Sequence, residues 1–203
     1  LSAYRKGIFP WYSGEQPILW WSPHPRCVLM PDELNVRRSL KKNMRNKDLF
    51  FSMNQAFKKV MSACAGPRRD GVGTWITPEM KEAYLKLHKL GYAHSAEVWE
   101  NGMVVGGLYG LAIGKVFFGE SMFSRRADAS KVALACLSKR LKSAGFRIID
   151  CQVSSSHLHS LGAKDIQRSD FIDLLNLYTP ESTQPFIWNY PQVRVNDFYF
   201  EQA

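Results

Sequence analysis

The two ligand spacings most typical of zinc sites are missing from this sequence. The four cysteines are scattered and form no C-x-x-C pair, and the five histidines form no H-x-x-x-H pair. Zinc sites usually draw two ligands from such a pair, so we expect no metal and interpret the histidines as core or surface residues. Two of the cysteines, Cys136 and Cys151, stand in apolar runs. We interpret them as buried thiols of a cytosolic protein with reduced cysteines.

Long apolar segments are missing as well. The sequence contains no signal peptide and no run of about 18 apolar residues, the length needed to span a membrane. It therefore indicates neither secretion nor membrane insertion, and a cytoplasmic location is expected. The first residue is Leu1 rather than methionine, so we expect the natural start to lie upstream.

Acidic residues are in the minority. Lys and Arg number 27 against 18 Asp and Glu, which gives a net charge of +9 and a pI ≈ 9.5. This balance indicates a polyanionic partner, with nucleic acid the first candidate, and a merely basic solvated surface is the alternative. With 203 residues, 45% of them hydrophobic, the chain is long enough for one globular domain with at most a small appendage.

The shortage of acid is concentrated between residues 34 and 47, where no Asp or Glu occurs. The pattern within 33–47 predicts a helix with acid at its start and base at its end. It has one apolar stripe, Leu34, Val36, Leu40 and Met44, and one basic face, Arg38, Lys41, Lys42 and Arg45. A face of a single sign repels itself, and phosphates would relieve that repulsion. We expect sequence-independent contacts to a nucleic-acid backbone here.

Aromatic residues and prolines crowd residues 1–31, a composition that disfavours long helices. Most of these aromatics are interpreted as a small satellite core. Trp11, which follows a proline, is assigned to a binding site, because an aromatic face stacks on unpaired bases. Trp75 lies beside the basic loop 66–73 and has two equally supported interpretations. It packs on the helix that Thr77 caps, or it forms a second stacking platform.

The pattern from residue 94 onward predicts three antiparallel strands, a helix and a further strand. Asn101-Gly102 is a strong hairpin signal between the first two strands. An alanine-rich helix over 127–144 then leads to a strand over 146–153. This order resembles the acyltransferase fold typified by the N-acetyltransferases, an α+β fold whose mostly antiparallel central sheet is flanked by helices. In that fold a strand-to-helix turn holds the coenzyme A pyrophosphate, and Asp128 in that turn argues against coenzyme A here.

Two carboxylates interrupt apolar strands of this sheet. Asp150 and Gln152 are two residues apart in one strand and are expected to share a face. Glu120 interrupts the third strand of the meander in the same way. A carboxylate within an apolar strand is costly unless it is paired or hydrated. Two interpretations of Asp150 remain open: a solvated strand end, or a polar pair with Gln152 at the floor of a cleft.

Motifs along most of the chain resemble the leucyl/phenylalanyl-tRNA–protein transferase family. They occur in order up to about Trp188, and the tail beyond it carries none. We expect further family residues upstream of Tyr4. The motifs are YRKGIFPW (4–11), WWSP (20–23), GTWIT (73–77), HS (94–95), EVW (97–99), GGLYG (106–110), GESMFS (119–124), ASK (129–131) and IDCQV (149–153).

The resemblance implies an enzyme that transfers Leu or Phe, and less readily Met, from aminoacyl-tRNA to the N-terminal Arg or Lys of a protein. The product would be a bacterial N-degron, read by a cytosolic protein-degradation pathway. No coenzyme A, metal or other cofactor is expected. Residues 1–25 would be the remnant of a small N-terminal domain, and residues 26–203 the GNAT-like aminoacyltransferase domain.

The resemblance also assigns roles to individual residues. Asp150 and Gln152 would be catalytic; because glutamine does not titrate, we interpret Gln152 as a partner of the attacking amine, oriented and polarised by Asp150. Glu120 would hold the cationic N-terminus or side chain of the acceptor. The other assignments are Trp11 and Trp75 at the tRNA 3′ adenosine, Phe117, Met122, Leu134 and Ile149 around the aminoacyl side chain, and Arg38, Lys42 and Arg45 on the tRNA body.

Two rival functions stay open on the sequence. One is an acetyl-CoA-dependent N-acetyltransferase, against which Asp128 argues. The other is a tRNA-binding module without activity, against which the pair of Asp150 and Gln152 argues.

Overall fold

One twisted sheet runs through the molecule. The computed structural model describes residues 1–12, 16–46, 48–66, 76–182 and 187–201, and within them the sheet has eight strands in the order β10-β4-β5-β6-β7-β8-β3-β9. Neighbouring strands pair antiparallel except β7 and β8, which are parallel. The strands are β3 (Arg26–Leu29), β4 (Phe50–Met53), β5 (Ala93–Glu100), β6 (Met103–Ile113), β7 (Val116–Ser124), β8 (Ile148–Gln152), β9 (Lys164–Ile166) and β10 (Tyr190–Arg194).

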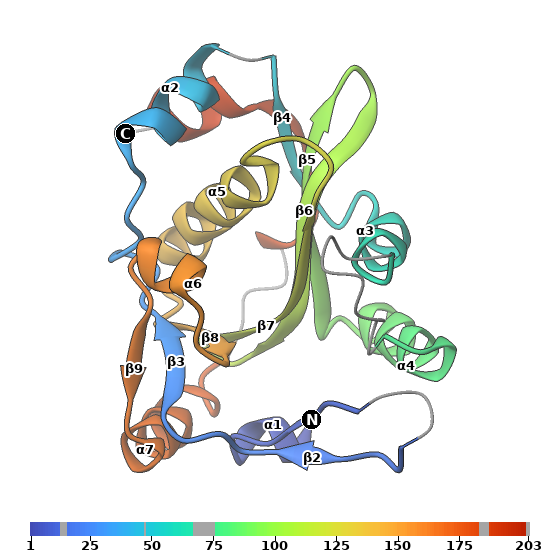
Figure 1. Ribbon diagram of the computed structural model, residues 1–203, viewed down its shortest axis with the longest axis vertical. Coiled ribbons are helices and arrows are strands. Elements are labelled where there is room, and N and C mark those ends of the chain that lie inside the picture. The colour runs from blue at the N-terminus through green and yellow to red at the C-terminus, as the bar shows by residue number, and fades with distance from the viewer. Residues whose placement is uncertain (13–15, 47, 67–75, 183–186, 202–203) are drawn as a thin grey trace.

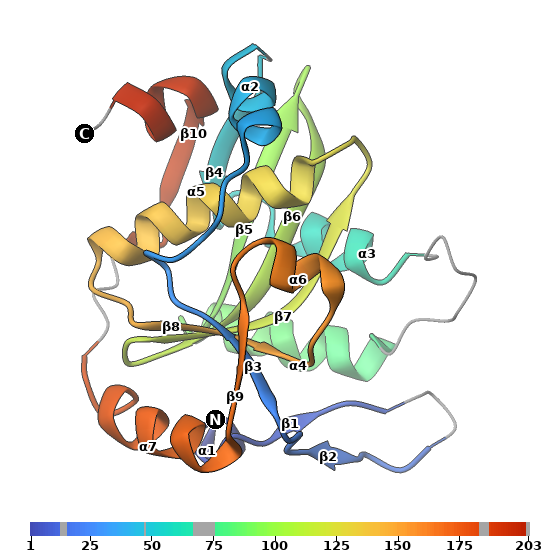
Figure 2. The same cartoon turned by 60° about the vertical axis from the view of Figure 1, so that its left-hand side comes forward.

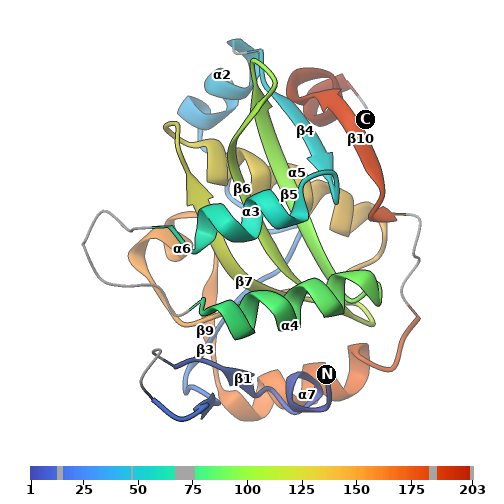
Figure 3. The same ribbon diagram turned by 90° about the vertical axis from the view of Figure 1, so that its right-hand side faces the viewer.

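Helices cover both faces of this sheet (Figures 1 and 3). On one face lie α2 (Arg38–Asn46) and α5 (Ala129–Ser143), and on the other lie α3 (Phe57–Cys64) and α4 (Pro78–Lys89). Each face has its own cluster of buried apolar residues, because successive strand residues point to opposite sides. The predicted α+β class, with a mostly antiparallel sheet flanked by helices, is confirmed.

Smaller elements gather at the two ends of the molecule. At one end are α1 (Ser2–Arg5), the short hairpin β1 (Phe9–Pro10) and β2 (Trp20–Trp21), and α7 (Arg168–Tyr178). At the other end α2 lies beside β10 and a C-terminal π-helix, Asp197–Glu201. Figure 2 shows α5 crossing the sheet between these ends, with α6 (Ser156–Ser160) below it.

The central order predicted from the sequence is confirmed. β5, β6 and β7 form an antiparallel meander, α5 crosses over, and β8 joins parallel to β7. Thr77 caps α4 as expected, its hydroxyl accepting from the Met80 amide at 3.3 Å. Gly106 in β6 is required by close approach, because an added Cβ would lie 2.5 Å from that of Ala129 at the start of α5.

The predicted helix over 33–47 is wrong at its start. Helix α2 begins at Arg38, and residues 34–37 before it have no regular secondary structure. The Asn35 amide donates to the Leu161 carbonyl at 2.8 Å, which holds this segment against the end of α6. Leu40 and Met44 are buried as predicted, and the basic residues on the opposite face stay in solvent.

Candidate active site

The site lies where the two parallel strands separate. β7 and β8 are paired only from Val116 and Ile148 to Phe118 and Asp150. Beyond those pairs the strands diverge, and a cavity opens between Gly119 and the end of β8. Divergence at this point exposes the edges of both strands to a ligand.

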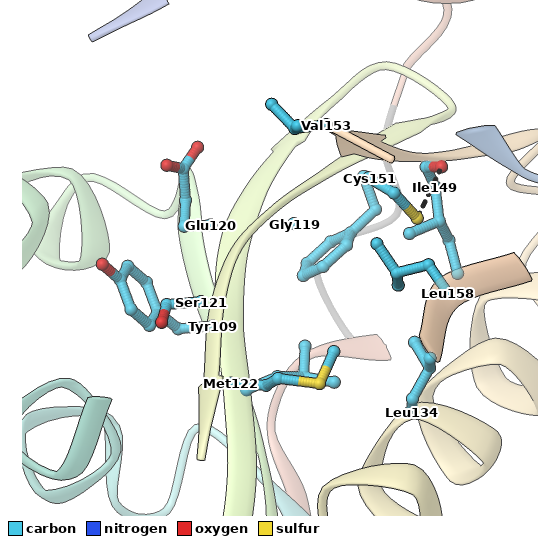
Figure 4. A pocket seen from close by; sticks show the side chains of 12 residues that line it. Tyr109, Gly119, Glu120, Ser121, Met122, Leu134, Ile149, Cys151, Val153 and Leu158 are labelled. Carbon is cyan, nitrogen blue, oxygen red and sulfur yellow. Dashed lines mark hydrogen bonds between the residues drawn. The ribbon is translucent and has the colours of Figure 1, made fainter. Parts of the chain in front are cut away.

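Each strand also has an irregularity at this point. Glu120 has no partner residue in β6, since the register shifts there, and Cys151 likewise has none in β3. Such β-bulges turn side chains away from simple alternation and occur often beside active sites. The bulge points Glu120 to the α4 side of the sheet, while Met122 points to the α5 side (Figure 4).

Glu120 is buried among neutral hydrogen-bond donors. The Tyr4 hydroxyl donates to Oε1 at 2.7 Å and the Tyr84 hydroxyl to Oε2 at 2.8 Å. The side-chain amide of Gln152 donates to Oε1 at 3.3 Å. Burial raises the pKa of Glu120 to about 7, although these hydrogen bonds favour the charged form and lower it. This carboxyl group therefore changes its charge near neutral pH.

Asp150 is buried too, but it has a cation. Arg26 of β3 forms a bidentate pair with it, Nε to Oδ1 at 2.8 Å and Nη2 to Oδ2 at 2.7 Å. The same guanidinium donates to the Gly7 carbonyl at 3.0 Å and lies between the rings of Phe9 and Phe171. The interpretation of Asp150 as a solvated strand end is wrong, because the residue is 0% exposed.

The expected side-chain contact between Asp150 and Gln152 is replaced by a main-chain contact. The Gln152 amide N–H donates to Asp150 Oδ1 at 2.9 Å, and Gln152 has a left-handed backbone with φ 66°. Few side chains favour that conformation, so the bond to Asp150 stabilises it. The Gln152 side chain then reaches Glu120 rather than Asp150.

A cavity of about 380 Å³ lies against this group (Figure 4). All four residues expected around the aminoacyl side chain line it: Phe117, Met122, Leu134 and Ile149. Leu108, Leu158 and Val153 add further apolar surface, and Glu120 stands at its polar edge. The walls are suited to the apolar side chain of an amino acid whose polar main-chain end points toward the carboxyl group of Glu120.

A smaller cavity of about 150 Å³ adjoins the first, and both are lined by Glu120 and Cys151. Trp11 lines it from the hairpin end of the molecule, together with Gln152. The Trp11 indole is 43% exposed, and its ring lies 5.9 Å from that of Trp21. Trp11 thus stands at the mouth of the site, whereas Trp75 lies outside the described residues.

The basic face of α2 is remote from both cavities. Figures 1 and 2 place α2 at the opposite end of the molecule from the β1–β2 hairpin. Arg38, Lys41 and Lys42 are exposed there, and the Arg45 guanidinium lies 4.2 Å from the centre of the Phe200 ring. This face offers a second, separate contact surface.

Sequence reasoning missed three residues of the site: Arg26, Tyr4 and Tyr84. Only Arg26 had a signal of its own, because it is a cation directly before the apolar run Cys27–Leu29. Asp150 is likewise an anion within an apolar strand. Tyr4 stood in the motif YRKGIFPW without an assigned role, and Tyr84 carried no signal, since their partner Glu120 is distant in the sequence.

Comparisons with known proteins show the family of this chain. Residues 28–176 match the model of the leucyl/phenylalanyl-tRNA protein transferase family, and residues 1–24 match its N-terminal domain. A leucyl/phenylalanyl-tRNA–protein transferase from Aromatoleum aromaticum is 54% identical over 93% of this chain and 80% of its own length. Another from Azotobacter vinelandii is 58% identical over 86% and 77%.

This chain belongs to the leucyl/phenylalanyl-tRNA–protein transferase family. Members of that family are aminoacyltransferases, so the chain is an enzyme of this class. Among solved structures, a GCN5-related N-acetyltransferase from Kribbella flavida is similar with a TM-score of 0.45 and 13% identity, covering 78% of this chain and 56% of that one. Within the described parts of the transferase, no helix is both long enough and apolar enough to cross a membrane.

Proposed function

We propose that the protein transfers Leu or Phe, and less readily Met, from aminoacyl-tRNA to the α-amine of proteins that begin with Arg or Lys. The amine nitrogen attacks the ester carbonyl carbon, the bond to the 3′ ribose oxygen breaks, and a peptide bond forms. The amine loses a proton and the ribose oxygen gains one, so no cofactor is consumed. The observation that carries the proposal is the apolar cavity beside Glu120 in a chain of this family.

The larger cavity fits the donor side chain. Its apolar walls favour Leu, Phe and Met, each of which gains about 1.5–3 kcal/mol on full burial. The ester carbonyl would then lie toward the polar edge, near Glu120 and Gln152. Holding ester and amine together here supplies much of the rate acceleration, because the ester is already activated.

Glu120 is the group that meets the acceptor amine. Its carboxylate attracts the α-ammonium, and its pKa of about 7 is close to that of an α-amino group, roughly 7.7–8.0. A base matched in this way accepts a proton at little cost. Gln152, held by Glu120 on one side, is placed to orient the amine.

Asp150 acts through position rather than by proton transfer. Both of its oxygens accept from Arg26, and one also accepts from the Gln152 main chain. Asp150 lines neither cavity, whereas Glu120 lines both, so Asp150 does not meet the incoming amine. It sets the geometry of Gln152, and Arg26 keeps that geometry rigid.

The tRNA would be held at two places. Trp11 at the mouth of the smaller cavity is suited to stack on the terminal adenosine, and Trp75 is proposed as its partner. The exposed face of α2 with Arg38, Lys42 and Arg45 is proposed to hold the tRNA body through phosphates. The modified acceptor would leave as an N-degron substrate in the cytoplasm.

The test is an incubation of the protein with Leu-tRNA and a peptide beginning with Arg, followed by mass spectrometry. We expect a mass gain of one leucyl residue, unaffected by chelators and by the absence of coenzyme A. The same peptide with an acetylated N-terminus, and uncharged tRNA, serve as controls and should give no product. Acetyl transfer from acetyl-CoA without tRNA would support the rival N-acetyltransferase instead.

That rival is disfavoured by the turn before α5. Asp128 stands at the N-cap with φ 65° and forms an ion pair with Lys131 at 2.7 Å. A carboxylate at this position repels the pyrophosphate that the turn would have to bind. We therefore propose aminoacyl-tRNA as the donor.

A further inference from the structure

Three potential metal ligands meet on the outer strands of the sheet. Cys27 of β3 is directly paired with Asp165 of β9, so their side chains lie on the same face. His159 of α6 approaches the same pair. One ligand atom from each of the three lies within 4.8 Å of the others. The three come from separate segments, so they form no C-x-x-C or H-x-x-x-H pair in the sequence.

The side chains of His159 and Asp165 are in direct contact. His159 Nε2 lies 3.2 Å from Asp165 Oδ2, a separation close to that between two ligands of one tetrahedral ion, roughly 3.4 Å for bonds of about 2.1 Å. Ser154 donates to the other oxygen, Asp165 Oδ1, at 2.5 Å. That bond fixes the carboxylate and leaves Oδ2 turned toward the histidine.

Access from solvent comes from one side only. The side chains of His159 and Asp165 are 44% and 32% exposed, whereas Cys27 is fully buried beneath them. The Cys27 thiol also contacts that of Cys151. A cation can therefore enter from the surface and reach a sulfur ligand below it.

We propose that Cys27, His159 and Asp165 bind one thiophilic divalent cation, with Zn²⁺ as the physiological candidate. Sulfur, imidazole and carboxylate together suit Zn²⁺ and do not suit Mg²⁺ or Ca²⁺, which take oxygen ligands. Binding displaces the thiol proton of Cys27 to solvent. The fourth position is filled by water.

The cation would act as a clamp rather than as part of the chemistry. It links α6 to β3 and β9, and Leu158, next to His159, lines the larger cavity. One wall of that cavity is thus fastened to the sheet when the ion is bound. Binding of the cation is measured by absorption and thermal stability rather than by transfer activity, so this proposal can fail without the proposed reaction failing.

The experiment titrates the metal-free full chain with Co²⁺, followed by absorption and then by displacement with Zn²⁺. We expect one ion per chain, a sulfur-to-cobalt charge-transfer band, and a rise in the thermal midpoint with Zn²⁺. Absence of the band, or binding without any rise in the midpoint, would overturn the proposal.

Variants separate the ligands from their neighbours. His159→Gln and Asp165→Asn change partly exposed side chains and should each weaken Zn²⁺ affinity by at least about 10-fold, while Cys27→Ser should remove the charge-transfer band. His157→Gln, on the same short helix, is the matched control and should bind as the unmodified chain does. Unchanged affinity in His159→Gln and Asp165→Asn, or equal loss in His157→Gln, would contradict the assignment.

Discussion

Glu120 and Asp150 are two buried carboxylates on neighbouring strands with different partners. Asp150 is 0% exposed and faces a guanidinium that meets both of its oxygens. Glu120 is 9% exposed and is bonded by two phenols and one amide. Both interrupt an apolar strand, and the sequence alone gives them the same appearance.

The difference in partners separates a structural role from a chemical one. A cation in bidentate contact compensates the buried carboxylate of Asp150, so the pair holds β3 against β8. Neutral donors only partly offset the burial of Glu120, so its charge stays costly and its pKa rises to about 7. The carboxyl group that is free to change its charge is the one that faces the cavities.

Removing the charge of Asp150 should have the largest effect. Asp150→Ala leaves the Arg26 guanidinium buried without a counter-charge, which costs about 3–5 kcal/mol of stability. Urea unfolding measures this loss. The double variant Arg26→Met/Asp150→Leu should recover most of the stability but little activity, because the main-chain N–H of Gln152 still lacks the carboxylate that accepts its hydrogen bond. A loss below about 1 kcal/mol in Asp150→Ala would show that the pair does not hold the fold.

Glu120→Gln should instead stabilise the protein above neutral pH. The carboxyl pKa is about 7 in the fold against an ordinary glutamate value of 4.5, a difference worth about 3 kcal/mol. The favourable contribution of the neutral acid is fully present below pH 4.5 and is lost as the pH rises through 7. Thermal midpoints of both proteins should nearly agree at about pH 5 and diverge at about pH 8, with the variant higher. The same difference between the two thermal midpoints at both pH values would refute the elevated pKa of Glu120.

The same variant should be a poor enzyme. Without the carboxylate the acceptor amine loses its charged partner and proton acceptor, so kcat/KM for the acceptor peptide should fall about 100-fold. The KM for Leu-tRNA should change little, since the nucleic acid is held elsewhere. Steady-state kinetics with each substrate varied in turn tests this split, and a rise confined to the tRNA KM would reverse the assignment of Glu120.

Reversing charges on α2 should have the smallest effect on the reaction. It should weaken only the binding of tRNA. Arg38→Glu with Lys42→Glu should raise the KM for tRNA and flatten its salt dependence by about one unit of slope per lost phosphate contact. Lys86→Glu with Lys89→Glu on α4 makes the same charge change on the other face of the sheet and serves as the matched control. An equal effect of both pairs would mean that net charge, not the α2 face, attracts the tRNA.

Local patterns predicted the scaffold well. The Asn101-Gly102 hairpin, the Thr77 cap and the alanine-rich crossover helix all depend on nearby residues, and each is where it was expected. The polar interruptions at Glu120 and Asp150 also marked the correct strands. These features need no knowledge of distant contacts.

The partners could not be predicted, because they come from elsewhere in the chain. Tyr4 and Arg26 lie near the N-terminus, far in sequence from Glu120 and Asp150. The bulges at Glu120 and Cys151 arise from strand register rather than from composition. Simple alternation therefore gave Gln152 a side-chain contact with Asp150, whereas its left-handed backbone turns the side chain to Glu120.

The most direct test of this division of roles is the titration of Glu120 itself. The carboxyl carbon of Glu120, assigned by its absence in Glu120→Gln, is followed by ¹³C NMR from acidic to alkaline pH. The account predicts a midpoint of about 7. A midpoint near the ordinary value of 4.5 would mean that Glu120 is as firmly charged as any surface carboxylate, and the contrast with Asp150 would fail.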